Sequence, residues 1–538
     1  MTLLPLEPET QQRVASKPVL RDDPKFAAAR IAIFQYSTVA IFLFLISGFW
    51  DLQVRNPELY NELAERNRIK ALPIIAPRGK ILDRDGRVIV DNHLSWSVIL
   101  SRETLKPEHL KPIADGLQLE YDDLLQQLKR YRGRPKYEPI IIKQELTPAD
   151  VAFVESHKDP EFFPELELIH AQRRLYPEGG FGAHVIGYTG EVSESELDSP
   201  EFAKYEPGSV VGKFGIEKQY NDILTGVDGQ RQVIVDNRGR EREVLGTTEA
   251  VPGKNIQLTL DLDLQAVAEL VLEGRKGAIV ALDPRNGEVL AMASRPTFDP
   301  NKFSVRIKSS DWKELLDNPD HPLLNRAIQA QFAPGSTFKP LMAIAGLETG
   351  AIDDQFSVHC TGGATFYGHY YKCHEVDGTV SLHKGIVRSC DVYFYNVGNR
   401  LGIDQIAHYA TEAGYGQPTG IDLPHEASGV VPSSEWKIRN FRQKWYAGET
   451  ISVSIGQGAL TITPIQLARA IGGIAMGGIW YKPHLLKSAK PEPPHQLALN
   501  PENVAKVVSG MCGVVNEEGG TGVRAKLPGV TVCGKTGT

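Results

Sequence analysis

The longest uncharged stretch of the chain lies near its N-terminus. Residues Ile31 to Trp50 contain no charged side chain, and about 20 apolar residues are enough to cross the core of a bilayer as one helix. Asp51 follows directly, and five basic residues precede the stretch: Arg13, Lys17, Arg21, Lys25 and Arg30. Because the flank rich in Lys and Arg stays in the cytoplasm, the pattern predicts a cytoplasmic tail over residues 1–30, a single transmembrane helix over residues 31–50 and an extracytoplasmic remainder.

A cleaved signal peptide is the alternative interpretation of this stretch. Its apolar part would be shorter, and it would end in the small residues of a cleavage site. Such residues are lacking after Trp50. We therefore favour a single-pass anchor in the cytoplasmic membrane.

Residues 51–250 combine the patterns of strands and helices. Lys80 to Val90 (KILDRDGRVIV) reads as two strands separated by Asp85 and Gly86, which is typical of a hairpin. Pro107 to Arg132 shows the spacing of apolar residues expected of helices. This half is predicted to be a mixed α/β domain, and it contains no convincing group of nucleophile, acid and base.

The pattern changes at Gly277, where GAIVALDPRNGEVLAMAS begins. It predicts strands over Ala278 to Leu282 and Glu288 to Ala293, joined by a turn at Pro284 to Gly287. Helical stretches follow up to Gly529, and Val530 to Cys533 reads as a last strand. Strands at both ends with helices between them predict an α+β domain over residues 251–538, with an antiparallel sheet built from distant segments.

Length and composition agree with a multidomain protein. The chain has 538 residues, of which 41% are apolar and 23% charged, and such a length corresponds to about three or four domains. Its net charge of -7 provides no basic field for nucleic acid. Nucleic-acid binding is therefore not expected.

A candidate nucleophile lies in the segment Gln331 to Thr349 (QFAPGSTFKPLMAIAGLET), where an apolar helix is predicted to begin at Ser336. Ser336 and Lys339 are three residues apart, so one helical turn places both side chains on one face. A lysine can take the proton of a serine only when burial or another cation lowers its pKa. For an isolated pair of this kind, a serine that caps the helix and a solvated lysine are the more common explanation.

Two further motifs change that balance. Ser389, Cys390 and Asp391 form a second motif, and Lys535, Thr536, Gly537 and Thr538 form a third on the predicted last strand. A second hydroxyl can relay a proton to a leaving amine. A Lys-Thr-Gly strand offers a cation and hydroxyls to the carboxylate of an extended peptide. The backbone N–H groups of Ser336 and Thr538 are candidates for an oxyanion hole.

These residues resemble the penicilloyl-serine transferase superfamily, and more narrowly the elongation-type class B penicillin-binding proteins, penicillin-binding protein 2. The resemblance covers nearly the whole chain after the anchor. In the second half it includes GAIVALDPRNGEVLAMAS, FAPGSTFKP, SCDVYFYNVG and SIGQGALTITPIQLA. In the first half it includes APRGKILDRDGRVIVDN, RRLYP, AHVIGYTGEV and GKFGIEKQYN.

The resemblance implies an elongated pedestal (dimerisation) domain over residues 51–250 and a transpeptidase domain over residues 251–538. It implies that Ser336 attacks the penultimate D-Ala carbonyl of a peptidoglycan stem peptide, with Lys339 as base and Ser389 as proton shuttle. Lys535, Thr536 and Thr538 would hold the terminal carboxylate. Penicillins would acylate the same serine, and a carboxypeptidase side activity would accompany cross-linking. The implied partners are a SEDS-type glycosyltransferase and the elongation machinery, and no cofactor is required.

Two departures from the family pattern matter. Asp391 stands where many relatives have Asn, although the elongation branch commonly has Asp, and this supports the subtype. The sequence ends at Thr538, whereas the fold should continue through further strands and a helix. Without them the Lys535 strand becomes an exposed sheet edge. We therefore expect the 538-residue form to be unstable or inactive, and full penicillin labelling would refute this.

Five cysteines come late in the chain, and their number is too small for a disulfide scaffold. Cys360, Cys373, His374 and Cys390 are candidate ligands of a structural zinc, with Asp377 as a competing fourth ligand. The alternative is a disulfide between Cys360 and Cys373, with Cys390 as a small buried residue. Cys512 and Cys533 are predicted to be buried thiols.

Three rival functions are less well supported. A class A β-lactamase uses an additional glutamate for deacylation, and no E-x-x-L-N segment follows Asp391. A non-catalytic scaffold that activates a glycan polymerase is disfavoured by the intact motif residues. A penicillin sensor is disfavoured by the short N-terminal tail, which has no signalling domain.

Overall fold

The computed structural model describes residues 24–55, 58, 69–133, 139–157, 162–205, 208–235, 241–304, 307–490 and 492–537. The chain divides into two compact units. The first consists of Met1–Ile74 and Gln230–Glu249, and the second of Ile75–Gly229 and Ala250–Thr538.

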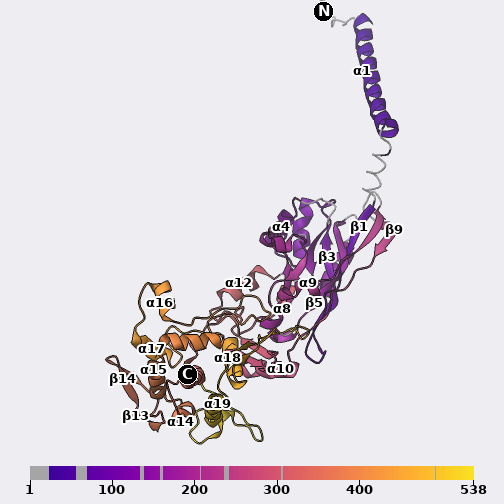
Figure 1. Ribbon diagram of the computed structural model, residues 1–538. Coiled ribbons are helices and arrows are strands. Elements are labelled where there is room, and N and C mark those ends of the chain that lie inside the picture. Colours follow the sequence, from indigo (N-terminus) through magenta and orange to yellow (C-terminus); the bar gives the residue numbers. More distant parts are fainter. Residues whose placement is uncertain are drawn as a thin grey trace, which may run out of the picture. The chain divides into compact units, whose positions relative to one another are not determined.

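The first unit contains the apolar helix that the sequence predicts. Helix α1 covers Pro24–Trp50 and continues as a π-helical turn over Asp51–Arg55 (Figure 1). Residues Ile31–Arg55 are long and apolar enough to cross a membrane. The unit also contains a three-stranded sheet in the order β1 (Ile69–Ile74), β8 (Gly229–Val235) and β9 (Glu241–Thr248). Most of the predicted cytoplasmic tail, residues 1–23, lies outside the described residues.

The pedestal part of the second unit is built on a five-stranded sheet. Its path is β10 (Ile256–Gln257), β2 (Ile81–Leu82), β3 (Val88–Leu100) and β4 (Ile140–Gln144), and β5 (Leu166–Leu175) pairs with β3. Strands β2 and β3 form the predicted hairpin, and Asp83 Oδ1 accepts the N–H groups of Asp85 and Arg87 in its turn.

Helices α3 (Leu110–Gly116), α4 (Tyr121–Arg130) and α5 (Pro148–His157) cover one part of this sheet. Helices α3 and α4 confirm the helical spacing of Pro107 to Arg132. Ile113 and Leu124, together with Val154 of α5, are buried in one core with residues of β3 and β4. Shorter elements follow: α6 (Ala183–Ile186), β6 (Thr189–Glu191), α7 (Glu194–Leu197), β7 (Val210–Gly212), α8 (Gly215–Gln219) and α9 (Asn221–Leu224).

A buried ion cluster joins three segments of the pedestal. The carboxylate of Glu217, which is 0% exposed, accepts hydrogen bonds of 2.6 Å from Arg78 Nε and from Arg174 Nε. Tyr176 Oη donates to it at 3.4 Å. These residues come from the quoted segments APRGK, RRLYP and GIEKQYN. The three segments therefore meet in one buried polar cluster inside the core.

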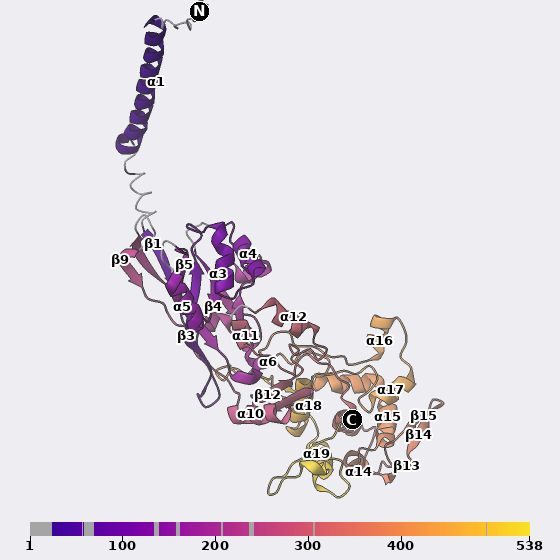
Figure 2. The same ribbon diagram turned by 180° about the vertical axis from the view of Figure 1, so that it is seen from behind.

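The transpeptidase part begins with the predicted hairpin of β11 (Gly277–Leu282) and β12 (Val289–Arg295). Helix α10 (Leu262–Val271) packs on β12 through Ala268, together with Leu272 at the C-cap of the helix. The main apolar core lies among α13 (Lys339–Glu348), α14 (Leu382–Val387), α15 (Asp391–Glu412), α17 (Ala447–Val453), α18 (Pro464–Ala475) and α19 (Pro501–Asn516). Figure 2 shows α14, α15, α17, α18 and α19 in this part of the chain.

The remaining elements of this part are short. They are α11 (Asn301–Ser304), α12 (Ser309–Asp317), α16 (Ser434–Phe441), β13 (Val358–Cys360), β14 (Gly363–Phe366), β15 (His369–Lys372), β16 (Gly378–Val380), β17 (Ile479–Trp480) and β18 (His495–Gln496). A second core contains Ile81 and Val90 of the pedestal together with Val289, Ile465 and Leu485. The two halves of the second unit thus share buried apolar contacts, and the domain boundary at residue 250 stays a prediction.

Two expectations for the last segment are wrong. Val530 to Cys533 is not a strand, because its backbone pairs only through the isolated bridge between Leu527 and Val530. The segment is instead attached to α19, where Asn516 Nδ2 donates to Val532 O at 2.8 Å. Cys512 and Cys533 are not buried thiols, since they form a disulfide between α19 and this segment.

We expect Glu217→Gln to lower the free energy of unfolding of the second unit by about 3 kcal/mol or more. The reason is that Arg174 and Arg78 would remain buried without a charged partner. Urea unfolding followed by tryptophan fluorescence measures the effect. Asp222→Asn is the matched control, because its partner Lys204 is exposed and exposed ion pairs contribute little. Equal midpoints for both variants would contradict a stabilising role of the cluster.

Candidate active site

Ser336 lies in a tight turn that two glycines make possible. A 3₁₀ turn covers Gly335–Phe338 and leads directly into α13. Gly335 N donates to Gly456 O at 2.8 Å, and a Cβ on Gly456 would come within 2.2 Å of Gly335 O. Ser336 is buried inside this turn and does not cap it, since Pro334 and Phe338 occupy the N-cap positions.

Lys339 is fully buried and is held by the second motif. Its Nζ donates to Asp391 Oδ1 at 2.6 Å, to Ser389 O at 2.7 Å and to Ser389 Oγ at 3.1 Å. Burial lowers the pKa of Lys339, whereas the negative charge of Asp391 acts in the opposite direction. The alternative of a capping serine and a solvated lysine is therefore wrong on both points.

Ser389 connects the two lysines of the site. It lies between α14 and α15 with a φ of 57°, a left-handed conformation that is costly for a serine. Its Oγ accepts from Lys339 Nζ at 3.1 Å and from Lys535 Nζ at 2.9 Å. Both acceptor positions of the hydroxyl are thus used, and its own proton is free to be donated.

The third motif reaches the same site. Burial, together with the positive charge of Lys339, lowers the pKa of Lys535 to about 7. Thr536 Oγ1 is 2.7 Å from Thr521 Oγ1. A Cβ on Gly537 would lie 3.0 Å from Thr337 Cγ2, so this glycine passes close to the turn that carries Ser336. Thr538 lies outside the described residues.

One expected contact does not form. Among the residues that the structure describes, Ser336 Oγ makes no hydrogen bond to Lys339 Nζ. The three donor positions of the ammonium are occupied by Ser389 and Asp391 instead. Catalytic hydrogen bonds are often long in the absence of substrate, so the geometry is compatible with a contact that shortens when the substrate binds.

The cysteines gather beside the second motif. Ligand atoms of Cys360, Cys373, Asp377 and Cys390 all lie within 4.8 Å of one another. The predicted ligand His374 is not among them, because its exposed ring lies 3.7 Å from Asp391 Oδ2. The predicted alternative of a disulfide between Cys360 and Cys373 is also wrong, as both are free thiols.

The cysteine group fits a tetrahedral zinc. A zinc with Zn–S bonds near 2.3 Å separates its sulfur ligands by roughly 3.8 Å, and Cys373 Sγ is 3.9 Å from Cys390 Sγ. Cys373 Sγ also accepts the Asp391 N–H at 3.2 Å. The hydrogen bond from Cys390 and nearby backbone N–H groups lowers the pKa of the Cys373 thiol, which favours the thiolate that a metal needs.

Sequence reasoning missed two features of this site. The first is Gly456, which belongs to the quoted segment SIGQG and lies against the Ser336 turn. Its place in that segment was the only signal. The second is the contact between Cys373 and the backbone of Asp391. No spacing in the sequence indicates it, because it depends on how the loop before α14 folds back.

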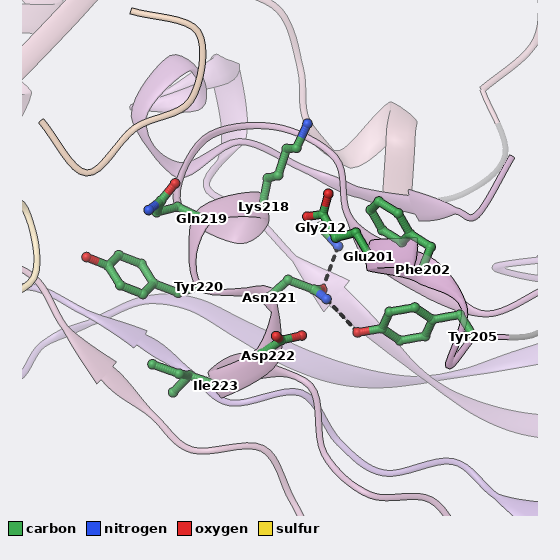
Figure 3. Close-up of a pocket in the computed structure, with 10 residues that line it drawn as sticks. All are labelled: Glu201, Phe202, Tyr205, Gly212, Lys218, Gln219, Tyr220, Asn221, Asp222 and Ile223. Carbon is green, nitrogen blue, oxygen red and sulfur yellow. Dashed lines mark hydrogen bonds between the residues drawn. The ribbon is translucent and has the colours of Figure 1, made fainter. Parts of the chain in front are cut away.

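A separate cavity lies in the pedestal. It measures about 130 Å³ and is lined by residues that include Tyr205, Lys218 and Asn221 (Figure 3). Asn221 accepts from Gly212 N at 2.9 Å and donates to Tyr205 Oη at 2.6 Å across its wall. The cavity contains none of the predicted site residues.

Comparison with known proteins agrees with this geometry. Residues 277–538 match the penicillin binding protein transpeptidase domain, and residues 73–258 match the penicillin-binding protein dimerisation domain. A protein of Acinetobacter baumannii named peptidoglycan D,D-transpeptidase MrdA is 38% identical over 515 residues, which cover 92% of this chain and 76% of that relative. This chain belongs to the class B penicillin-binding proteins.

Within this family the similarity points to the elongation type. A protein of Escherichia coli, also named peptidoglycan D,D-transpeptidase MrdA, is 35% identical over 503 residues and covers 89% of the chain and 78% of its own length. Class B proteins of this type are peptidoglycan D,D-transpeptidases that cross-link the wall during elongation. The α+β fold with a pedestal and a transpeptidase domain is thereby confirmed.

Solved structures give the same result. The penicillin-binding protein 2 of Helicobacter pylori, in complex with MreC, has a TM-score of 0.74 at 29% identity and covers 87% of this chain and 88% of that one. A chain from a structure described as "Structural coordination of polymerization and crosslinking by a peptidoglycan synthase complex" has a TM-score of 0.66 at 33% identity, with coverages of 95% and 88%.

Proposed function

We propose that this class B protein forms cross-links through an acyl intermediate on Ser336. The observation that carries the proposal is the buried Lys339, one turn after Ser336 and within 3.1 Å of the Ser389 hydroxyl. A neutral Lys339 takes the proton of Ser336 while Ser336 Oγ attacks the penultimate D-Ala carbonyl. Burial favours the neutral amine that this step requires.

The second step breaks the D-Ala–D-Ala bond. The new Ser336 O–C bond forms as the peptide C–N bond breaks, and the departing nitrogen needs a proton. Ser389 donates it, since its oxygen accepts from both lysines and neither contact uses the hydroxyl proton. Lys339 returns the original proton to Ser389, so the acyl-enzyme forms without net gain or loss of protons.

The third motif binds the donor peptide. The terminal D-Ala carries a carboxylate, and Lys535 with the hydroxyls of Thr536 and Thr538 offers charge-assisted hydrogen bonds to it. The oxyanion of the tetrahedral intermediate would accept from the backbone N–H groups of Ser336 and Thr538. An amine from a second stem peptide then attacks the acyl-enzyme, and water in its place gives the carboxypeptidase side reaction.

The rival roles of scaffold and sensor fit these residues less well. A scaffold does not require a lysine buried beside the Ser389 hydroxyl and the Asp391 carboxylate, because such burial costs desolvation energy. A sensor would remain acylated. In this site, by contrast, Ser389 with Lys339 offers a general base to the acceptor amine that removes the acyl group. The geometry therefore favours turnover.

We also propose the topology and partners of the protein. Helix α1 would anchor the chain with its N-terminus in the cytoplasm, which places the catalytic domain outside the membrane. One similar structure is a complex of penicillin-binding protein 2 with MreC, and another is described as a peptidoglycan synthase complex that coordinates polymerization and crosslinking. By similarity, the partners would be an MreC-type protein and a SEDS-type glycosyltransferase of the elongation machinery.

A structural zinc would be held by Cys360, Cys373, Asp377 and Cys390. The sulfur spacing supports this assignment, and Cys390 lies directly between Ser389 and Asp391. The metal would supply no chemistry to the reaction. Its ligands fix the start of α15, where Asp391 meets Lys339, and thereby support the position of the second motif.

Labelling with a fluorescent penicillin tests the nucleophile. We expect Ser336→Ala to abolish labelling, because the acyl bond forms on Ser336 Oγ, and Lys339→Met to reduce its rate by about 10²-fold or more, because the general base is lost. Ser452→Ala is a matched control from the neighbouring helix α17, and it should label normally. Undiminished labelling of Ser336→Ala would rule out the proposed mechanism.

Elemental analysis of the purified protein tests the metal. We expect one zinc per chain, and loss of that zinc in Cys373→Ser because a thiolate ligand is removed. His374→Ala should retain the full amount, since the exposed His374 ring lies outside the cluster. Zinc-free wild-type protein, or zinc lost equally from both variants, would contradict the assignment.

A further inference from the structure

A surface of the transpeptidase part exposes basic and apolar side chains together, close to the active site. It follows the exposed half of α16 and the segment after it, and we call it the rim surface. Its members are Ile438, Arg439, Phe441, Arg442, Lys444 and Tyr446. The large apolar members are open to solvent, with exposures of 53% for Ile438, 58% for Phe441 and 53% for Tyr446.

The rim surface is attached to the rest of the domain by an ion pair, by aromatic contacts and by a hydrogen bond. Lys437 is buried, forms an ion pair with Glu449 of α17, and lies 5.5 Å from the ring centroid of Trp445 and 4.8 Å from that of Tyr446. The start of α16 is fixed as well, since Ser434 Oγ donates to Asp404 Oδ2 at 2.8 Å. The exposure of the rim therefore does not result from a loosely attached segment.

The cations of the rim surface are not neutralised by acidic side chains of the described residues. Within the described part of the chain, neither Arg439 nor Arg442 forms an ion pair, and Lys444 only lies 5.7 Å from the ring of Tyr446. The neighbouring acid Glu449 is already paired with Lys437. Unpaired cations in one place attract an anionic partner, and contiguous exposed apolar side chains indicate a binding surface.

An aromatic hairpin extends the rim surface. Strands β14 and β15 carry Tyr367 and Tyr370 at an exposed tip, with exposures of 63% and 53%. Tyr371 Oη donates to Gly448 O at 3.1 Å, which attaches the hairpin to the start of α17. Figures 1 and 2 both show α16, α17 and this hairpin at the same end of the transpeptidase part.

Helix α17 connects the rim surface to the catalytic turn. It begins at Ala447, directly after the rim, and ends at Val453. Gly456 follows and accepts the hydrogen bond from Gly335 next to Ser336. The rim is thus one short helix away from Gly456, which contacts the turn that carries the nucleophile.

We propose that the rim surface binds the glycan–peptide strand that supplies the acceptor amine, and this rests on the proposed function of Ser336. Stem peptides carry free carboxylates that match Arg439, Arg442 and Lys444. The flat C–H faces of pyranose rings pack on aromatic rings such as Tyr446 and Phe441, whose faces are negative. A small penicillin, which fills only the catalytic turn, does not reach this surface.

The test measures strand binding without turnover. Uncross-linked glycan strands with stem peptides are titrated onto the full chain carrying Ser336→Ala, in the presence and absence of the charge reversals Arg439→Glu, Arg442→Glu and Lys444→Glu. We expect the reversals to weaken binding by about tenfold or more. The matched control reverses exposed cations elsewhere, with Arg275→Glu, Lys302→Glu and Lys313→Glu, and it should leave strand binding unchanged.

Penicillin acylation separates this proposal from the function on which it rests. In the Ser336 background, the rim reversals should leave the acylation rate unchanged, which also shows that the variant is folded. Equal strand binding by the rim variant and its parent would overturn the proposal. An equal loss of strand binding in the control variant would also overturn it. The same holds if the rim reversals abolish binding to anionic phospholipid vesicles and leave strand binding intact. Acylation of the Ser336→Ala chain at the rate of the chain with Ser336 would instead overturn the function of Ser336.

Discussion

The active site depends on one buried ammonium group. Lys339 is fully enclosed, and its three hydrogen bonds bind together the turn of Ser336, the backbone of Ser389 and the carboxylate of Asp391. Taking a lysine out of water is costly unless its partners are well placed. The fold supplies those partners from a loop and a helix start that are about 50 residues away in the chain.

The same constraint explains several unusual features around the site. Ser389 adopts a positive φ, and this conformation allows both its carbonyl and its hydroxyl to face Lys339. Gly335 and Gly456 approach each other more closely than side chains would permit. The sulfur of Cys373 accepts the backbone N–H of Asp391 from the other side. Strain and close approach are concentrated where the chemistry needs a fixed geometry.

Local sequence patterns predicted the elements whose structure depends on interactions within one segment. The apolar helix, the hairpins at Lys80 and Gly277, and the helices after Pro107 depend on hydrophobic spacing and turn residues within each segment. The family resemblance then brought together Ser336, Lys339, Ser389 and Lys535, of which the structure places Lys339, Ser389 and Lys535 in one connected hydrogen-bond network beside the Ser336 turn.

Features that depend on contacts between distant segments could not be predicted in the same way. The segment of Cys533 looked like a strand, but α19 and Cys512 bind it instead. His374 looked like a metal ligand from its neighbours in sequence, whereas the loop turns its ring to solvent and Asp377 takes its place. In both cases the prediction was wrong because tertiary contacts with distant segments decided the partner of the residue.

The pH dependence of penicillin acylation in Asp391→Asn tests this account most directly. Acylation needs neutral Lys339, so its rate rises with pH as the ammonium loses its proton. Asp391 raises the pKa of Lys339, and removal of its charge should therefore move this rise to lower pH, by about one unit or more. A rise at an unchanged or higher pH would contradict the claim that Lys339 is the base and that Asp391 controls its charge.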